Sequence, residues 1–122
     1  MVIFDTNVIL RYILQDDQAM AEQVEAQLIS NICFIPVEVI AEIVYVLSKV
    51  YNVEKKVIAQ VVTDITNTDN ITVAQTNVVR HALCVYAATA LDFVDCLLVG
   101  YAKEEQYTVF TFDKKLQKYL KK

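Results

Sequence analysis

The sequence predicts a single α/β domain over residues 1–122, built as a sandwich of helices around a parallel sheet. Short apolar runs rich in β-branched and aromatic residues alternate with longer stretches of helical character. A length of 122 residues fits one compact domain. A single glycine and a single proline indicate that the connecting loops are short.

Four apolar runs are expected to form the strands. Each is short, and the residues that follow it favour the start of a helix or a turn. The runs are 2–4, 32–35, 71–73 and 107–112. Apolar and polar residues alternate in the last run, which is typical of a strand.

Seven helices are expected between and after these runs. Their ranges are 8–14, 18–30, 36–51, 54–66, 76–88, 92–105 and 113–121. The third is apolar on nearly every face, so we expect it to be a buried helix at the centre of the domain.

The apolar content, 56% of the residues, raises the question of a membrane segment. The most apolar stretch, 35–50, carries Glu38, Glu42 and Lys49 and contains Pro36, whereas a spanning helix needs about 20 mainly apolar residues. The start of the chain lacks the basic region and the cleavage site of a signal peptide. We therefore expect a cytosolic protein with no membrane segment.

The inventory of charged and metal-binding residues limits the kinds of site. One histidine and three cysteines without Cys-x-x-Cys spacing exclude zinc sites built on several such ligands. The net charge of −4 argues at first against a nucleic-acid partner. Residues 103–122, however, hold six lysines against three acids, a local charge of +3, while residues 1–102 sum to −7. Charge alone therefore leaves a nucleic-acid partner open.

Carboxylates stand at positions where α/β folds build sites. Asp5 and Asp113 follow the first and last predicted strands, and ligand sites of open α/β sheets form at the carboxyl ends of strands. Asp95 lies one turn into a helix that Asp92 can cap. Glu42 lies on the apolar helix, where a buried carboxylate has to be paired, hydrogen-bonded or bound to metal.

Each acid also has an ordinary structural interpretation. Asp5 and Asp113 are good N-cap residues, and Glu42 can lie on a narrow polar stripe with Glu38 and Lys49. Four converging carboxylates would repel one another unless a cation lay among them. Oxygen ligands without nearby His or Cys select Mg²⁺ or Mn²⁺. Such a cation can activate water for hydrolysis of a phosphodiester.

Four motifs occur in order along essentially the whole chain. They are Phe4-Asp5-Thr6-Asn7, Ala41-Glu42, Asp92-Phe93-Val94-Asp95-Cys96-Leu97-Leu98 and Thr111-Phe112-Asp113-Lys114. The ordered set resembles a PIN domain and, in length and spacing, the VapC-type toxin ribonucleases of toxin–antitoxin pairs. One departure is Glu105-Gln106-Tyr107, where such toxins often have a glycine before the last strand.

The resemblance implies a three-layer sandwich with a central, mainly parallel sheet of four to five strands. It implies an endoribonuclease that depends on Mg²⁺ or Mn²⁺. It implies a homodimer, and an antitoxin protein whose tail enters the site. The catalytic and metal-binding residues would be Asp5, Glu42, Asp95 and Asp113, with Asp92, Thr6, Asn7 and Thr111 in support. The cations best placed to bind RNA would be Arg11, Lys103, Lys114 and Lys115.

Other classes of acidic α/β protein fit less well. A receiver domain needs paired acids after the first strand and a phospho-accepting aspartate near mid-chain, but only Asp5 follows that strand and Asp64 lies in a helical stretch. A haloacid-dehalogenase phosphatase needs a second aspartate where the chain has Asn7. A catalytically silent PIN fold acting as a binding or assembly module, and a PIN nuclease outside a toxin–antitoxin pair, stay open as alternatives.

Overall fold

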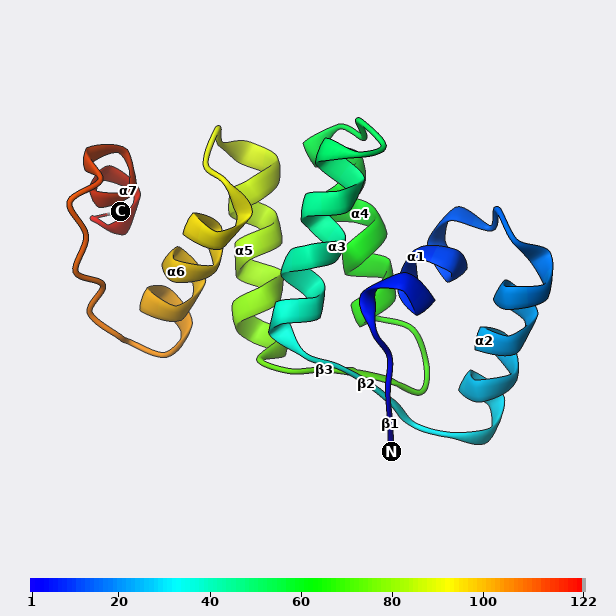
Figure 1. Cartoon of the computed structure of the whole chain (residues 1–122). Coiled ribbons are helices and arrows are strands. Elements are labelled where there is room, and N and C mark those ends of the chain that lie inside the picture. The colour runs from blue at the N-terminus through cyan, green and yellow to red at the C-terminus, as the bar shows by residue number, and fades with distance from the viewer. Residues whose placement is uncertain (122) are drawn as a thin grey trace.

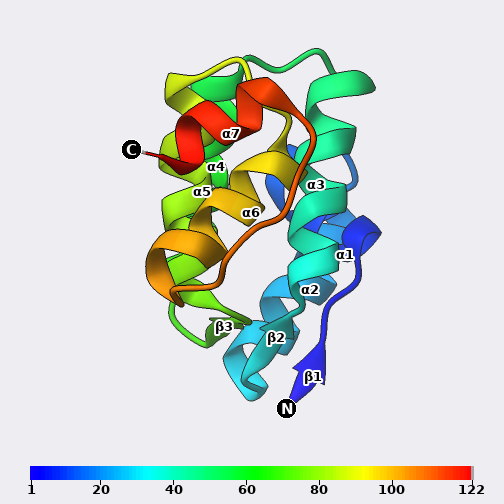
Figure 2. The same cartoon turned by 90° about the vertical axis from the view of Figure 1, so that its left-hand side faces the viewer.

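The computed structural model describes residues 1–121 and contains a small parallel sheet. Its strands are β1 (Val2–Ile3), β2 (Cys33–Ile35) and β3 (Ile71–Val73), in the order β1-β2-β3. All neighbours are parallel, with Val2 opposite Cys33 and Cys33 opposite Ile71. The strands lie together at one end of the molecule, and the helices stand over them (Figures 1 and 2).

The seven helices within residues 1–121 follow the predicted pattern closely. They are α1 (Thr6–Leu14), α2 (Gln18–Ser30), α3 (Val37–Lys49), α4 (Lys55–Thr66), α5 (Thr76–Ala88), α6 (Phe93–Glu104) and α7 (Lys114–Leu120). The bounds of α2 and α5 are those predicted. Asp17 caps the start of α2, whereas α5 starts without a side-chain cap. The α/β class is therefore confirmed.

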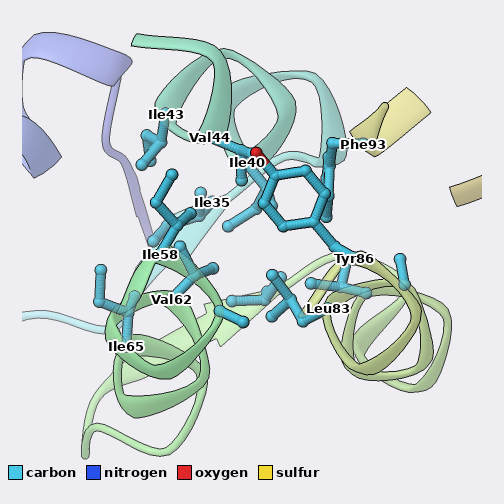
Figure 3. Close-up of a cluster of buried hydrophobic side chains, with 14 of the residues drawn as sticks. Ile35, Ile40, Ile43, Val44, Ile58, Val62, Ile65, Leu83, Tyr86 and Phe93 are labelled. Atoms are coloured by element: carbon cyan, nitrogen blue, oxygen red, sulfur yellow. The ribbon is translucent and has the colours of Figure 1, made fainter. Parts of the chain in front are cut away.

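The core forms where α3, α4 and α5 meet above the sheet (Figure 3). Ile40, Ile58 and Val62 are fully buried there, beside Ile35 from β2. β-branched side chains dominate this cluster, and their stiffness favours a single packing arrangement. The core thus fixes α3 and α5, the two helices against which α6 lies.

The sheet has three strands in the described chain, so the expectation of four to five was wrong. Residues 107–112, predicted as the fourth strand, form an extended segment between α6 and α7. Phe110 and Phe112 are 85% and 87% exposed and contact each other, with ring centroids 5.3 Å apart.

The physical reason lies in local hydrogen bonds that compete with strand pairing. The Asp113 N–H donates to Thr111 Oγ1 at 3.0 Å, and Gln117 Nε2 donates to the Thr111 carbonyl at 2.7 Å. α7 is also tied back to α6, because Lys103 Nζ donates to the Leu120 carbonyl at 3.0 Å. β-propensity depends on an available neighbouring edge, and these bonds hold the segment away from one.

The missing glycine before this segment has a visible consequence. Gln106 adopts a φ of 56°, in the left-handed region that favours glycine. The chain therefore makes a turn at Gln106, where the resemblance led us to expect a glycine.

No helix among residues 1–121 combines the length and the apolar character needed to cross a membrane.

Candidate functional site at the start of α6

The start of α6 places two aspartates within its first turn. Asp92 is the N-cap residue, and its carbonyl accepts from the Cys96 N–H at 3.0 Å. Its exposed side chain makes no capping hydrogen bond. Asp95 lies in the first turn and is half-buried. The Asp92 carboxylate is thus not used for capping, whereas those of Asp5 and Asp113 are.

Asp95 lies in an environment that disfavours its charge. Burial is the main cause that raises the pKa of its carboxyl group, followed by repulsion from Asp113 and Asp92, while Lys115 acts in the opposite direction. The structure therefore brings Asp92, Asp95 and Asp113 close enough to influence one another. Such a group of like charges is stabilised by a cation.

Cys96, next to Asp95, adds no soft ligand to this group. Burial raises the pKa of its thiol to about 11, so the thiol is protonated at neutral pH. Its Sγ faces the Leu91 carbonyl at 3.9 Å. The donors at the start of α6 are therefore carboxylate oxygens, which suit Mg²⁺ or Mn²⁺.

Asp5 and Asp113 each cap a helix. Asp5 Oδ1 accepts from the Val8 N–H and Asp113 Oδ1 from the Leu116 N–H, both at 3.0 Å. Both aspartates are exposed, and each capping bond uses one carboxylate oxygen. Capping therefore explains their positions and leaves their second oxygens open.

Glu42 lies on the exposed side of α3. Glu38 and Lys49 are exposed as well, so the polar-stripe interpretation describes the helix, and the expectation of a buried helix was wrong for this face. α3 lies between the start of α6 and the junction of β1 with α1 (Figure 2). Residues 1–121 contain no group of three or more Asp, Glu, His or Cys side chains close enough to hold a metal. Among the candidate acids, Asp92 and Asp113 act electrostatically on Asp95.

The predicted supporting residues have mixed placements. Thr111 is hydrogen-bonded to the cap of α7, so it orients Asp113. Thr6 and Asn7 lie in the first turn of α1, beyond Asp5.

The predicted RNA-binding cations are placed unequally. The Arg11 guanidinium is held by Asp16 at 2.9 and 2.7 Å, which neutralises it. Lys103 bonds the end of α7, as described above. Lys115 Nζ donates to the Ala90 carbonyl at 3.3 Å and acts on the charge of Asp95, while Lys114 is exposed. Lys115 is therefore the predicted cation that the structure places nearest the acids.

Lys55, at the start of α4, is a residue that the sequence did not single out. Its Nζ donates to the carbonyls of Thr89 and Leu91 at 2.8 and 2.7 Å and lies 4.3 Å from the centre of the Tyr86 ring. Burial lowers the pKa of its ammonium group, and Asp92 partly offsets this. Lys55 thereby fixes the loop that leads into α6. Its sequence context, Glu-Lys-Lys at a helix start, looks like an ordinary surface.

A pocket of about 480 Å³ opens beside the two aspartates of α6. α3 forms one wall, and the end of α5 and the start of α6 form another. Asp92, Asp95 and Lys55 line it together with aromatic side chains. Its volume lies within the range of about 300–1,000 Å³ typical of ligand pockets.

The fold and this site define a small α/β protein with two aspartates at the start of a helix beside a pocket. The PIN domain family profile matches residues 2–122, and the chain belongs to this family. PIN domains are generally nucleases, which supports a hydrolase acting on nucleic acid. No curated protein and no solved structure matched the chain.

Proposed function

We propose that the chain is an endoribonuclease that depends on Mg²⁺ or Mn²⁺ and hydrolyses RNA phosphodiester bonds through Asp5, Glu42, Asp95 and Asp113. The observation that supports this most is the position of Asp95. Its carboxylate is partly desolvated and repelled by Asp92 and Asp113, in a chain of a nuclease family. Perturbed carboxylates of this kind are common at functional sites.

The donors at the start of α6 fit a divalent cation in their chemistry. Asp95 and Asp113 would hold the metal, with Asp5 and Glu42 completing the site from α1 and α3. When bound, the metal would supply an activated water and offset the charge that develops on the phosphate. The chain's own part is to hold the acids in place, through the caps at Asp5 and Asp113 and the Lys55 contacts to the loop before α6.

We further propose that the protein is the toxin of a type II toxin–antitoxin pair and forms a homodimer. Several large apolar side chains are exposed on the single chain, including Ile29 at 82% and Ile3 at 65%. Exposed apolar surface is typical of protein interfaces. A second copy and an antitoxin protein would cover part of it.

A second candidate function is a catalytically silent binding or assembly module. The absence of a group of three or more candidate metal ligands among residues 1–121 favours it. RNA cleavage by the parent protein and by Asp5→Asn distinguishes the nuclease from the binding module.

Removal of the charge at Asp5 tests the nuclease. In Asp5→Asn, the amide oxygen can still accept from the Val8 N–H, and Asn caps helices about as well as Asp. We expect the parent protein to cleave single-stranded RNA in the presence of Mg²⁺ or Mn²⁺. Cleavage should stop when EDTA removes the metal. We expect Asp5→Asn to unfold at the same urea concentration as the parent. Its cleavage rate should be lower by about 100-fold or more. The measurement is the rate of cleavage of a labelled RNA.

Asp17→Asn is the matched control, because Asp17 caps α2 in the same way through the Met20 N–H at 3.0 Å. It should cleave like the parent. If Asp5→Asn also cleaves like the parent, a contaminating nuclease explains the activity. A parent protein that does not cleave favours the binding module.

A further inference from the structure

The pocket beside α6 contains polar groups that no part of the described chain satisfies. Tyr86 is only 5% exposed, yet its hydroxyl lines the pocket and has no hydrogen-bond partner among residues 1–121. Figure 3 shows its ring crossing from α5 toward α3, with the hydroxyl beside Val44. The hydroxyl is not among the fully buried side-chain atoms without a partner, so it reaches the solvent in the pocket. The hydroxyl can therefore donate to or accept from a ligand in the pocket.

The rest of the pocket has the composition of a ligand site. Its floor is apolar, with Phe93 packed edge-to-face on the Tyr86 ring at 5.6 Å. Ser48 and Lys49, on the α3 wall, also have no hydrogen-bond partner within the described chain. An apolar pocket with a few convergent polar groups is the usual form of a small-ligand site.

The charges around the pocket favour a neutral ring over a free anion. Lys49 and Lys55 are balanced by Asp92 and Asp95, and the Lys55 ammonium is already bonded to two backbone carbonyls. A bare phosphate would meet two carboxylates. A flat, uncharged group that carries both donors and acceptors would meet suitable partners.

A free aromatic face stands at the pocket on α3. Tyr45 is 63% exposed and has no ring partner among residues 1–121. Proteins that recognise single-stranded RNA stack unpaired bases on such side chains. Lys49, on the next turn of α3, stands where it can neutralise the phosphate of a stacked nucleotide.

We propose that this pocket receives one unpaired base of the RNA, stacked on Tyr45, with its edge hydrogen-bonded to the hydroxyl of Tyr86. The proposal rests on the proposed function, because the pocket shares Asp92 and Asp95 with the candidate site. The base so held belongs to a nucleotide beside the scissile phosphate. The pocket therefore selects the position of the cut.

The test uses single-stranded RNA that carries one fluorescent 2-aminopurine, bound in EDTA so that it is not cleaved. We expect the parent protein to quench the fluorescence most at one position of the RNA. Tyr45→Ala should bind about tenfold more weakly or worse and lose the quenching, because stacking of one base contributes about this much. Tyr45→Phe should retain both. Tyr107→Ala is the control, because Tyr107 is equally exposed at 63% and lies outside the pocket.

Tyr45→Ala with the quenching and affinity of the parent would overturn the proposal. Tyr86→Phe removes one hydroxyl, so we expect its relative affinity for the four bases to change while its unfolding midpoint stays the same. Unchanged base preference in Tyr86→Phe contradicts the part assigned to the hydroxyl.

Cleavage separates this inference from the proposed function. Tyr45→Ala should raise KM for RNA and leave kcat near that of the parent. If the parent cleaves, Asp5→Asn does not and Tyr45→Ala has an unchanged KM, the nuclease stands and the base pocket falls. If binding quenches the 2-aminopurine fluorescence in a way that depends on Tyr45, but the RNA is never cleaved, the pocket stands and the nuclease falls.

Discussion

Asp95→Asn is expected to abolish RNA cleavage and at the same time to stabilise the fold. Loss of a carboxylate that holds the metal should lower kcat by about 100-fold or more. The amide carries no charge, so it avoids both the cost of burying a charge and the repulsion that raise the pKa of Asp95. The measurements are the cleavage rate and the thermal midpoint, which should rise by about 2 °C at pH 7.

The pH dependence of this gain has a definite sign. A raised pKa means that the folded state binds the proton more tightly than the unfolded state, so ionisation of Asp95 costs stability as pH rises. The gain of Asp95→Asn should therefore be full at pH 7 and shrink as pH falls toward the ordinary value of 3.8. Asp69→Asn, which changes an exposed acid on a turn before β3, should show neither effect. A destabilised or fully active Asp95→Asn would contradict the account of the site.

Gly100→Ala is expected to destabilise the protein, although alanine favours helices. A Cβ at this position of α6 would lie 2.7 Å from the Val78 carbonyl oxygen and 3.1 Å from Val78 Cγ1 on α5. A backbone oxygen cannot rotate away, so α6 must shift. Alanine gains about 1 kcal/mol of helix propensity, which offsets only part of the clash. We expect a net loss of about 1–3 kcal/mol in the free energy of unfolding in urea.

Gly100 is also expected to affect activity, because α6 carries Asp95 one and a half turns earlier. Gly100→Ser, with a larger side chain, should be less stable than Gly100→Ala and slower in cleavage. A Gly100→Ala protein as stable as the parent would show that α5 and α6 do not pack as closely as described.

The helices were the part of the fold that the sequence could predict. Apolar residues at helical spacing and capping aspartates such as Asp17 are local signals, and in α2 both signals are present. The segment 107–112 shows the limit of such reasoning. Its alternation is that of a strand, but strand formation depends on a distant edge, and the local bonds of Thr111 prevail.

The site could be predicted in part for the same reason. Asp92 and Asp95 lie three residues apart, so their proximity is local, and Asp113 joins them through the packing of α7 on α6. The exposure of Glu42 depends on which face of α3 the neighbouring helices cover, which apolar spacing on a nearly uniform helix does not define. The role of Lys55 depends on contacts to a loop more than thirty residues away. Only the three-dimensional structure shows such a contact.

The most direct test of the central claim, that these carboxylates hold a divalent metal, is a titration with Mn²⁺ followed by electron paramagnetic resonance. We expect the parent protein to bind Mn²⁺, Mg²⁺ to displace it, and Asp95→Asn and Glu42→Gln each to bind at least about tenfold more weakly. Asp69→Asn should bind like the parent. A parent protein that binds no Mn²⁺, or that binds it as tightly without Asp95 and Glu42 as with them, would contradict the claim.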